Sequence, residues 1–387
     1  MSIEPAEHIK NVPEYYFSVK LAEVARMNAE GKDVINLGVG SPDQPPSEAT
    51  IEALCESARK PDTHGYQSYT GIPELRRAFA GWYQKYYDVT LSENEILPLI
   101  GSKEGVLHIS LTFLNVGDGV LVPNPGYPTY SSVSSLMRAR LIPYDLQESN
   151  GWQPDFNALE QMDLSGVKLM WVNYPNMPTG ANATKTLFEK LVAFGKKHSI
   201  IICHDNPYSF ILNNKPMSIL SVEGAKDICI ELNSMSKSHN MPGWRMGMLA
   251  SNAQFVKWVL TEKSNIDSGQ FKPMQLATVA ALSNPPEWYD EMNALYAARR
   301  AWAEKIMDLL GCMYDKKQVG LFVWAKIRDT APDSKTFIDD ILYNANVFLT
   351  PGAIFGSNGQ RYVRISLCAP EEKLKEAYDR IEKMFNV

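Results

Sequence analysis

Short, strongly apolar segments alternate with longer amphipathic ones through the middle of the chain. The apolar segments are rich in β-branched residues and show no polar alternation, as in strands whose two faces are both covered. We expect such strands at residues 96–100, 119–123, 167–173, 199–204 and 228–233. Helices are expected at residues 103–114 and 185–198, the second with Leu187, Leu191 and Phe194 on one stripe. Strands that alternate with helices predict an α/β fold, a three-layer core around a mostly parallel sheet.

The two ends of the chain have a mixed pattern, which predicts a second, smaller unit. We expect helices at residues 14–30, 287–310, 336–343 and 371–385, and strands at residues 321–327 and 362–367. The Asn284-Pro-Pro286 break is a plausible boundary between the two units. We therefore expect a large domain of residues 45–284 and a smaller, discontinuous α+β domain of residues 1–44 plus 285–387.

The composition excludes several classes of protein. With 387 residues the chain can bury a sizeable core without disulfides or metal. Its 38 Lys and Arg against 44 Asp and Glu give a net charge of −6, which argues against nucleic acid or an anionic membrane as a partner. We expect no transmembrane helix and no signal peptide, because the required apolar runs are missing. The 5 cysteines are far apart and never in a Cys-x-x-Cys pair, which is typical of free thiols in the cytoplasm.

Common nucleotide, hydrolase and zinc motifs do not match. Gly38-Val-Gly40-Ser-Pro-Asp43 begins like a dinucleotide fingerprint but has Asp where the third glycine belongs, which argues against a dehydrogenase. The sequence holds no P-loop, no Gly-x-Ser-x-Gly and no His-Glu-x-x-His. The 6 histidines show no metal-binding spacing, so we expect no metal site. His204 and His239 adjoin the informative motifs, and we expect structural roles for them.

The most informative stretch is Asn233-Ser-Met-Ser-Lys-Ser-His-Asn-Met-Pro-Gly-Trp-Arg-Met-Gly247. It follows an apolar strand, so Lys237 lies at a strand end beside small hydroxyl residues. An isolated lysine is usually a solvated loop residue, but a lysine in this place can also be a nucleophilic amine that forms a Schiff base. Ser234 and Arg245 could hold a phosphate nearby. A carbonyl cofactor that binds lysine and carries a phosphate is pyridoxal 5′-phosphate.

Pyridoxal phosphate requires further groups, and the sequence places candidates at other strand ends. Asp205 follows an expected strand, where a carboxylate can keep the pyridine nitrogen protonated. Tyr208, three residues later, can hydrogen-bond the 3′ oxygen of the ring. Gly101-Ser-Lys-Glu-Gly105 lies between a strand and a helix, where backbone amides bind phosphate. Tyr127 follows another strand and can stack on the ring.

On these motifs the chain resembles fold-type I pyridoxal-phosphate enzymes of the class I/II aminotransferase family. The resemblance runs from Asn36-Leu-Gly-Val-Gly-Ser-Pro-Asp43 to Val363-Arg-Ile-Ser366. Its most specific signature is Ser-x-Ser-Lys followed by Gly-x-Arg, and it implies that Lys237 forms the internal aldimine. The other cofactor contacts that it implies are Asp205 at the ring nitrogen, Tyr208 at the 3′ oxygen, Tyr127 on the ring face, and Ser102, Lys103, Ser234 and Arg245 at the phosphate.

The resemblance also implies how substrate and subunits are arranged. Arg364 matches the arginine that clamps the substrate α-carboxylate as a bidentate pair. Gly38 or Gly40 is expected to lend a backbone amide to the same carboxylate. Tyr66 matches a tyrosine that reaches the phosphate of the neighbouring subunit. A site shared in this way implies a homodimer.

One position departs from the family pattern. The family usually has Asn-Pro-Thr-Gly, in which Asn bonds the 3′ oxygen, but here the run is Tyr174-Pro-Asn-Met-Pro-Thr-Gly180. The aligned residue is therefore Met177, which cannot donate that hydrogen bond. Either Asn176 replaces the missing donor by a local shift, or Tyr208 acts alone.

The resemblance implies a ping-pong transamination between an L-amino acid and a 2-oxo acid, in amino-acid biosynthesis. A β-lyase of the same fold, which eliminates a leaving group from Cβ, is the alternative because the cofactor motifs are shared. A pyridoxal-phosphate-sensing regulator needs a DNA-binding segment, for which the resemblance leaves no room. Residues 97–105 and 122–128 are similar to LL-diaminopimelate aminotransferases and related aspartate or alanine aminotransferases.

Overall fold

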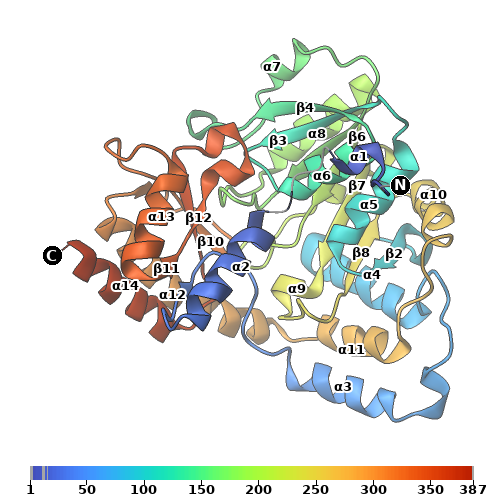
Figure 1. Cartoon of the computed structure of the whole chain (residues 1–387). Coiled ribbons are helices and arrows are strands. Elements are labelled where there is room, and N and C mark those ends of the chain that lie inside the picture. The colour runs from blue at the N-terminus through green and yellow to red at the C-terminus, as the bar shows by residue number, and fades with distance from the viewer. Residues whose placement is uncertain (1–2, 11–13, 15, 386–387) are drawn as a thin grey trace.

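The structure, a computed structural model, describes residues 3–10, 14 and 16–385. Its centre is a 7-stranded sheet with the order β2-β8-β7-β6-β5-β3-β4 (Figure 1). The strands are β2 (Ile96–Leu99), β3 (Gly119–Asn124), β4 (Arg140–Asp145), β5 (Val167–Asn173), β6 (Ile201–Asp205), β7 (Cys229–Ser234) and β8 (Gly247–Ala250). Strands β7, β6, β5, β3 and β4 are parallel, whereas β8 is antiparallel to both of its neighbours. The expected mostly parallel α/β sheet is confirmed.

Helices cover both faces of this sheet and give it three layers (Figure 1). On one face α5 (Ser102–Phe113), α6 (Pro128–Leu136) and α10 (Ala253–Lys263) pack against a buried apolar cluster that includes Leu99 and Leu232. On the other face the buried side chains of α4 (Pro73–Tyr87) and α8 (Lys185–His198) join the larger core cluster. Nearly all residues of β5, β6 and β7 are buried, apart from Lys168 and Ile201 near the strand starts, which explains why these sequences lack regular polar alternation.

Backbone geometry sets the ends of two elements that matter for the site. Gly101 has a φ of 80° and forms the sharp turn between β2 and α5, a conformation that favours glycine. Ser199 ends α8 in the left-handed region with a φ of 56°, so β6 begins at Ile201 rather than at residue 199. Asp205 then lies at the last position of β6.

A second, smaller unit is built from both ends of the chain. Its antiparallel sheet has the order β12-β13-β10-β9, and β1 pairs with β11 beside it. These strands are β1 (Ile35–Asn36), β9 (Met313–Tyr314), β10 (Phe322–Lys326), β11 (Val347–Phe348), β12 (Thr350–Pro351) and β13 (Tyr362–Ser366). The helices of this unit are α2 (Tyr16–Ala29), α12 (Pro286–Leu309), α13 (Ser334–Ala345) and α14 (Glu371–Phe385), and Figure 1 shows them around the sheet. Helix α2 is joined to α13 because Lys20 contacts Asp339 at 2.8 Å.

Two strands of the large sheet, β4 and β8, were not predicted from the sequence. Strand β4 lies at the sheet edge, is exposed or half-buried except at Tyr144, and contains Pro143, so it does not look like its apolar neighbours. Strand β8 is four residues long and begins at Gly247, the last residue of the stretch that contains Lys237, and no strand was expected there. Helices α3 (Glu48–Ala58) and α11 (Lys272–Leu282), together with α4, α6 and α10, were also not expected. Among the residues that the structure describes, no helix is long and apolar enough to cross a membrane.

Candidate active site

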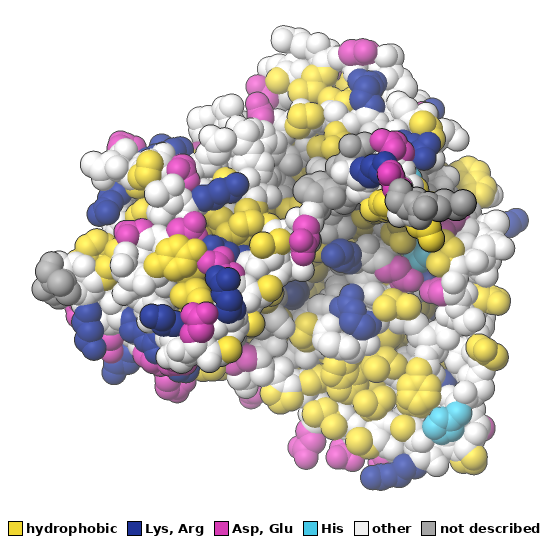
Figure 2. Space-filling model, in the orientation of Figure 1, with side chains coloured by type: hydrophobic (Ala, Val, Ile, Leu, Met, Phe, Trp, Pro, Cys, Tyr) yellow, Lys and Arg dark blue, Asp and Glu magenta, His cyan; other side chains and the backbone are white. Residues whose placement is uncertain are grey.

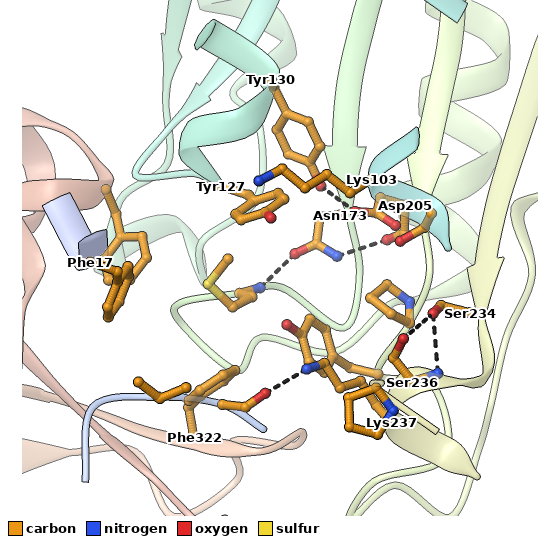
Figure 3. A pocket seen from close by; sticks show the side chains of 18 of the residues that line it. Phe17, Lys103, Tyr127, Tyr130, Asn173, Asp205, Ser234, Ser236, Lys237 and Phe322 are labelled. Carbon is orange, nitrogen blue, oxygen red and sulfur yellow. Dashed lines mark hydrogen bonds between the residues drawn. The ribbon is translucent and has the colours of Figure 1, made fainter. Parts of the chain in front are cut away.

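A pocket of about 420 Å³ opens where the carboxyl ends of β5, β6 and β7 face the small sheet (Figure 3). Ligands of open α/β sheets bind at this end of the strands. The expected residues that line it are Gly40, Ser102, Lys103, Tyr127, Asp205, Tyr208, Ser234, Lys237, Arg245 and Arg364. Although they are spread over more than 320 residues of sequence, the fold brings these ten together.

Lys237 lies on the short helix α9 (Met235–Ser238), which follows β7 directly. Its Nζ points into the pocket and donates a hydrogen bond of 2.5 Å to the carbonyl of Gly40 (Figure 3). Burial lowers the pKa of this amine, and the charges of Arg364 and Arg245 lower it further. A larger share of Lys237 is therefore uncharged near neutral pH than for an ordinary lysine, which is what a nucleophile or base requires.

Asp205 presents one free carboxylate oxygen at the floor of the pocket. The hydroxyl of Tyr130 donates to its Oδ2 at 2.8 Å, while Oδ1 is buried and accepts no hydrogen bond from the described part of the chain. Burial raises the pKa of this carboxyl to about 6, and polar interactions with Tyr130, His204 and Ser102 oppose that rise. Asn173 fixes the strand end by donating to the Asp205 carbonyl at 2.7 Å. The buried, unpaired oxygen fits a protonated ring nitrogen.

Small hydroxyl side chains and an arginine gather around the first turn of α5. The Ser234 hydroxyl lies 2.9 Å from that of Ser236 and accepts from the Ser236 amide at 3.1 Å. Arg245, which has a φ of 58°, donates to the carbonyls of Pro242 at 2.8 Å and Ile100 at 3.1 Å. A Cβ on Gly101 would collide with the Arg245 guanidinium. Only glycine at position 101 leaves room for the guanidinium. The backbone amides at the start of α5, the serine hydroxyls and the Arg245 cation together fit a phosphate.

Aromatic rings form the sides of the pocket. Tyr127 lies edge-on to Tyr130, with ring centroids 5.5 Å apart (Figure 3). Tyr208 is half-buried and lies edge-on to Phe322, with ring centroids 5.8 Å apart, and desolvation raises the pKa of its hydroxyl well above the ordinary value. Tyr208 therefore keeps its proton and can donate a hydrogen bond.

Arg364 reaches the pocket from β13 in the small sheet. Its guanidinium donates to the Gly38 carbonyl at 2.9 Å and to the Met177 sulfur at 3.1 Å. It also lies over the rings of Phe322, at 3.9 Å, and Phe355, at 4.8 Å. These contacts hold the planar cation on the small-sheet side of the pocket, facing the large sheet, where a carboxylate can bind.

Three expected residues do not line the pocket. The amide of Gly38 donates to the side chain of Asn36 at 2.9 Å and is already used. Asn176 is buried, donates to the Asn173 carbonyl at 3.1 Å and accepts from the Thr179 hydroxyl at 2.7 Å, so its side chain closes its own turn. Tyr66 is 96% exposed in the single chain.

The pocket also contains residues that sequence reasoning did not identify. Asn173 and Tyr130 hold Asp205, and Ser236 joins the hydroxyl cluster. Asn173 is the last residue of an expected strand, so its position was a usable signal. An apolar group completes the wall, and it consists of Phe17, Leu21, Val39, Phe322 and Phe355. Apart from Val39, which lies between Gly38 and Gly40, no local motif marks these residues, because they come from opposite ends of the chain.

A row of charged side chains supports the start of α5 from outside the pocket. Glu104 accepts a hydrogen bond from the Ile100 amide, and His108 contacts Glu104 at 3.0 Å and Glu262 at 2.6 Å. Since Arg245 holds the Ile100 carbonyl, the turn before α5 is fastened at both its amide and its carbonyl. Through the contact between His108 and Glu262, the turn that borders the phosphate-sized space is therefore linked to α10.

Comparison with known proteins agrees with this site. Residues 32–381 match the family model of aminotransferase class I and II. The chain is 38% identical over 379 residues to an LL-diaminopimelate aminotransferase of Dehalococcoides mccartyi, with 97% of each protein covered. It is 40% identical over 387 residues to the transaminase BacF of Bacillus subtilis, with 99% of this chain and 97% of the relative covered. The apo structure of BacF gives a TM-score of 0.95 at 39% identity and covers 100% and 99% of the two chains. The chain therefore belongs to the class I and II aminotransferases and is a pyridoxal-phosphate-dependent transaminase.

Proposed function

We propose that Lys237 binds the carbonyl carbon of pyridoxal phosphate and, once released, moves the α-proton of the substrate. Its buried amine and lowered pKa support both roles, because a nucleophile and a base each need the uncharged form. Bound pyridoxal phosphate supplies the electron sink that stabilises the negative charge left on Cα. Lys237 would hold the proton at Nζ meanwhile and deliver it to the former carbonyl carbon of the cofactor rather than back to Cα, as amino transfer requires.

The remaining polar residues are assigned to the ring and the phosphate. Asp205 Oδ1, which is buried and unpaired in the described chain, accepts the ring N–H. Tyr127 stacks on the ring, and Tyr208 donates to the 3′ oxygen. We assign that donor role to Tyr208 alone because Asn176 is engaged in its own turn and Met177 faces Arg364. The phosphate is assigned to Ser102, Lys103, Ser234, Ser236 and Arg245.

The walls of the pocket support an amino donor with an apolar or aromatic side chain. Arg364 receives the α-carboxylate, and the apolar group of Phe17, Leu21, Val39, Phe322 and Phe355 faces the rest of the substrate. Among the described residues that line the pocket, Asp205 is the one carboxylate, and it is committed to the ring. Diaminopimelate carries a second ammonium and carboxylate, and the apolar wall offers these charges no partner.

A set of single-turnover half-reactions tests this substrate class. Holoenzyme is mixed with phenylalanine, leucine, aspartate or LL-diaminopimelate, and the loss of the bound cofactor's absorbance is followed. We expect at least about tenfold higher kcat/KM for the two apolar donors, since burying a side chain of this size contributes 1.5–3 kcal/mol (roughly). Faster reaction with aspartate or LL-diaminopimelate contradicts the proposal.

A pair of variants on α2 sharpens that test. Phe17→Ala removes part of the apolar wall, whereas Val19→Ala changes a residue of the same helix that is 50% exposed. Only Phe17→Ala should lower the preference for phenylalanine over aspartate. Equal effects of both variants would show that α2 does not select the substrate.

We also propose that two copies form the active unit and that Tyr66 reaches the phosphate in the partner's site. Support comes from further exposed large side chains on the two segments that the Gln67–Gly269 bridge joins, namely Tyr69, Ile266 and Phe271. Figure 2 shows further hydrophobic side chains gathered over α9, α11 and α3. Light scattering should give twice the chain mass of 43.4 kDa. Tyr66→Phe should weaken pyridoxal-phosphate binding more than Tyr69→Phe, and a monomeric active holoenzyme would refute this assignment.

Two further assignments follow from the arrangement of the chain. We propose a large domain of residues 45–284 and a small domain of residues 1–44 plus 285–387, because the two sheets draw their strands from these parts. We propose the cytoplasm as its compartment, supported by 5 free cysteines in the described chain.

A further inference from the structure

A histidine and a glutamate form a fully buried pair on the far side of the sheet from the pocket. His204 on β6 and Glu231 on β7 are direct neighbours in the parallel register, and both are 0% exposed. His204 is adjacent to Asp205, but successive residues of a strand face opposite sides. Asp205 therefore faces the cofactor pocket, whereas His204 faces the core beside Phe188 of α8.

The hydrogen bonds around this pair determine where its protons lie. The Nε2 atom of His204 faces the Tyr174 carbonyl at 2.8 Å, and a carbonyl can only accept, so Nε2 carries a hydrogen. The Nδ1 atom faces Glu231 Oε2 at 2.8 Å. Glu231 also accepts from the Tyr83 hydroxyl at 2.7 Å, the Ser218 hydroxyl at 2.9 Å and the Ile219 amide at 3.0 Å.

Three donors besides the histidine therefore point at one carboxyl group. A protonated Glu231 would have to spend its own hydrogen on His204 and would leave Oε2 with one lone pair for two donors. An ionised Glu231 accepts all of them. The arrangement requires an imidazolium at His204 and a carboxylate at Glu231.

A charged pair inside the core is costly to desolvate and adds little stability over apolar residues. Its position suggests what it does instead. The imidazolium is one residue from Asp205, and its Nε2 fastens the Tyr174 carbonyl next to Asn173. Asn173 in turn donates to the Asp205 carbonyl. His204 thus acts on Asp205 through its charge and through the backbone of β5.

We propose that the His204–Glu231 pair is a positioning pair for the cofactor's ring nitrogen: the buried imidazolium keeps Asp205 ionised and fixed at the pocket floor. The proposal rests on the assignment of Asp205 to the ring nitrogen. Other titratable groups near the pair are the Tyr83 and Tyr87 hydroxyls from α4 and the Cys229 thiol of β7, while Asp205 is adjacent in sequence but faces the pocket. Neither Tyr83 nor any other contact named above supplies a second positive charge.

Glu231→Gln tests the pair with little change of shape. The Gln amide can donate to Nδ1 of a neutral His204, and Nε2 can still donate to Tyr174, so both charges disappear, while the Ile219 amide loses its acceptor. Selective ¹⁵N-histidine labelling of the apoprotein then reads the ring protonation directly. We expect one histidine, identified by its absence in His204→Gln, with both ring nitrogens protonated in the unmodified protein, and a neutral ring in Glu231→Gln. A neutral ring in the unmodified protein overturns the proposal.

Cofactor binding provides the second readout. Without the imidazolium, Asp205 takes up its proton at higher pH. When pyridoxal-phosphate affinity is plotted against pH, the acid limb, where affinity falls as the pH is lowered, should therefore move up by about one pH unit in Glu231→Gln. Glu160→Gln, which breaks the half-exposed contact of Glu160 with His198, is the matched control and should leave that limb unchanged. If the acid limb of the affinity profile lies at the same pH in the Glu231 and Glu160 variants, the positioning role is overturned.

The Asp205→Asn variant distinguishes an error in the role of the His204–Glu231 pair from an error in the assignment of Asp205 to the ring nitrogen. If Asp205→Asn leaves the acid limb of cofactor affinity in place, the assignment of Asp205 is wrong whatever the state of His204. If Glu231→Gln does not fold, His204→Gln replaces it, because the longer amide can still donate to the Tyr174 carbonyl.

Discussion

Arg364→Lys should selectively weaken reaction with substrates that carry an α-carboxylate. The guanidinium is buried among Phe322, Phe355 and Met177, so its orientation is fixed before the substrate arrives. Lysine keeps the positive charge but cannot offer two parallel N–H donors. The change therefore removes about one charge-assisted hydrogen bond, worth roughly 1.5–3 kcal/mol. At 1.36 kcal/mol for each factor of ten, kcat/KM should fall by about 10- to 150-fold.

The assay compares phenylalanine with 2-phenylethylamine, which has the same ring and amine but no carboxylate. The loss caused by Arg364→Lys should be confined to phenylalanine. Arg361→Lys is the matched control, because Arg361 lies just before β13 and its guanidinium donates to the carbonyls of Ala331 and Arg328 outside the pocket. An equal loss for both substrates, or no loss for phenylalanine, would refute the assignment of Arg364 to the carboxylate.

Three further outcomes are expected from local changes. Gly40→Ala should destabilise the fold by about 1–3 kcal/mol, because a Cβ there collides with a ring of the small sheet, whereas Gly81→Ala, with nothing nearby, should not; melting temperatures decide this. Tyr130→Phe removes a hydrogen bond that lowers the pKa of Asp205, so cofactor affinity should fall more at pH 6 than at pH 8 in a titration series. Burial lowers the pKa of His108, but the neighbouring carboxylates outweigh burial, and the net effect is a raised pKa. The protonated ring therefore contributes its full stability to the fold below about pH 6.5, and this contribution is lost as the pH rises through the raised pKa. Denaturant unfolding should accordingly show a larger deficit for His108→Gln at pH 5.5 than at pH 9, and a constant deficit would count against this charge.

The sequence was most informative where function lies at strand ends. Lys237 follows the buried strand β7 and Asp205 ends the buried strand β6. The composition reveals both strands, and parallel strands bring their ends to one edge. The residue that holds Asp205 was missed because Asn173 looks like the last residue of an ordinary strand. A departure from the family pattern at Met177 was visible in the sequence, but its consequence, a sulfur facing Arg364, needed coordinates.

Contacts between distant parts of the chain were beyond sequence reasoning. The apolar wall combines Phe17 from α2 with Phe355 from the other end of the chain, and only the folded small unit places them together. The buried state of His204 likewise depends on Glu231 and on the turn that carries Ser218. The net charge of −6 also hid a local feature, since Lys103, Lys237, Arg245 and Arg364 all line one pocket. Composition describes a whole surface, whereas anion binding depends on a few neighbours.

A single peptide map can decide whether Lys237 is the residue that binds the cofactor. Borohydride reduces the carbon–nitrogen double bond between pyridoxal phosphate and a lysine to a stable amine, so the modified peptide can be identified by mass spectrometry after digestion. The structure predicts that the label lies on Lys237 and that Lys237→Ala abolishes both labelling and amino transfer. A label on Lys103, which lines the same pocket, or full amino transfer by Lys237→Ala would contradict this account.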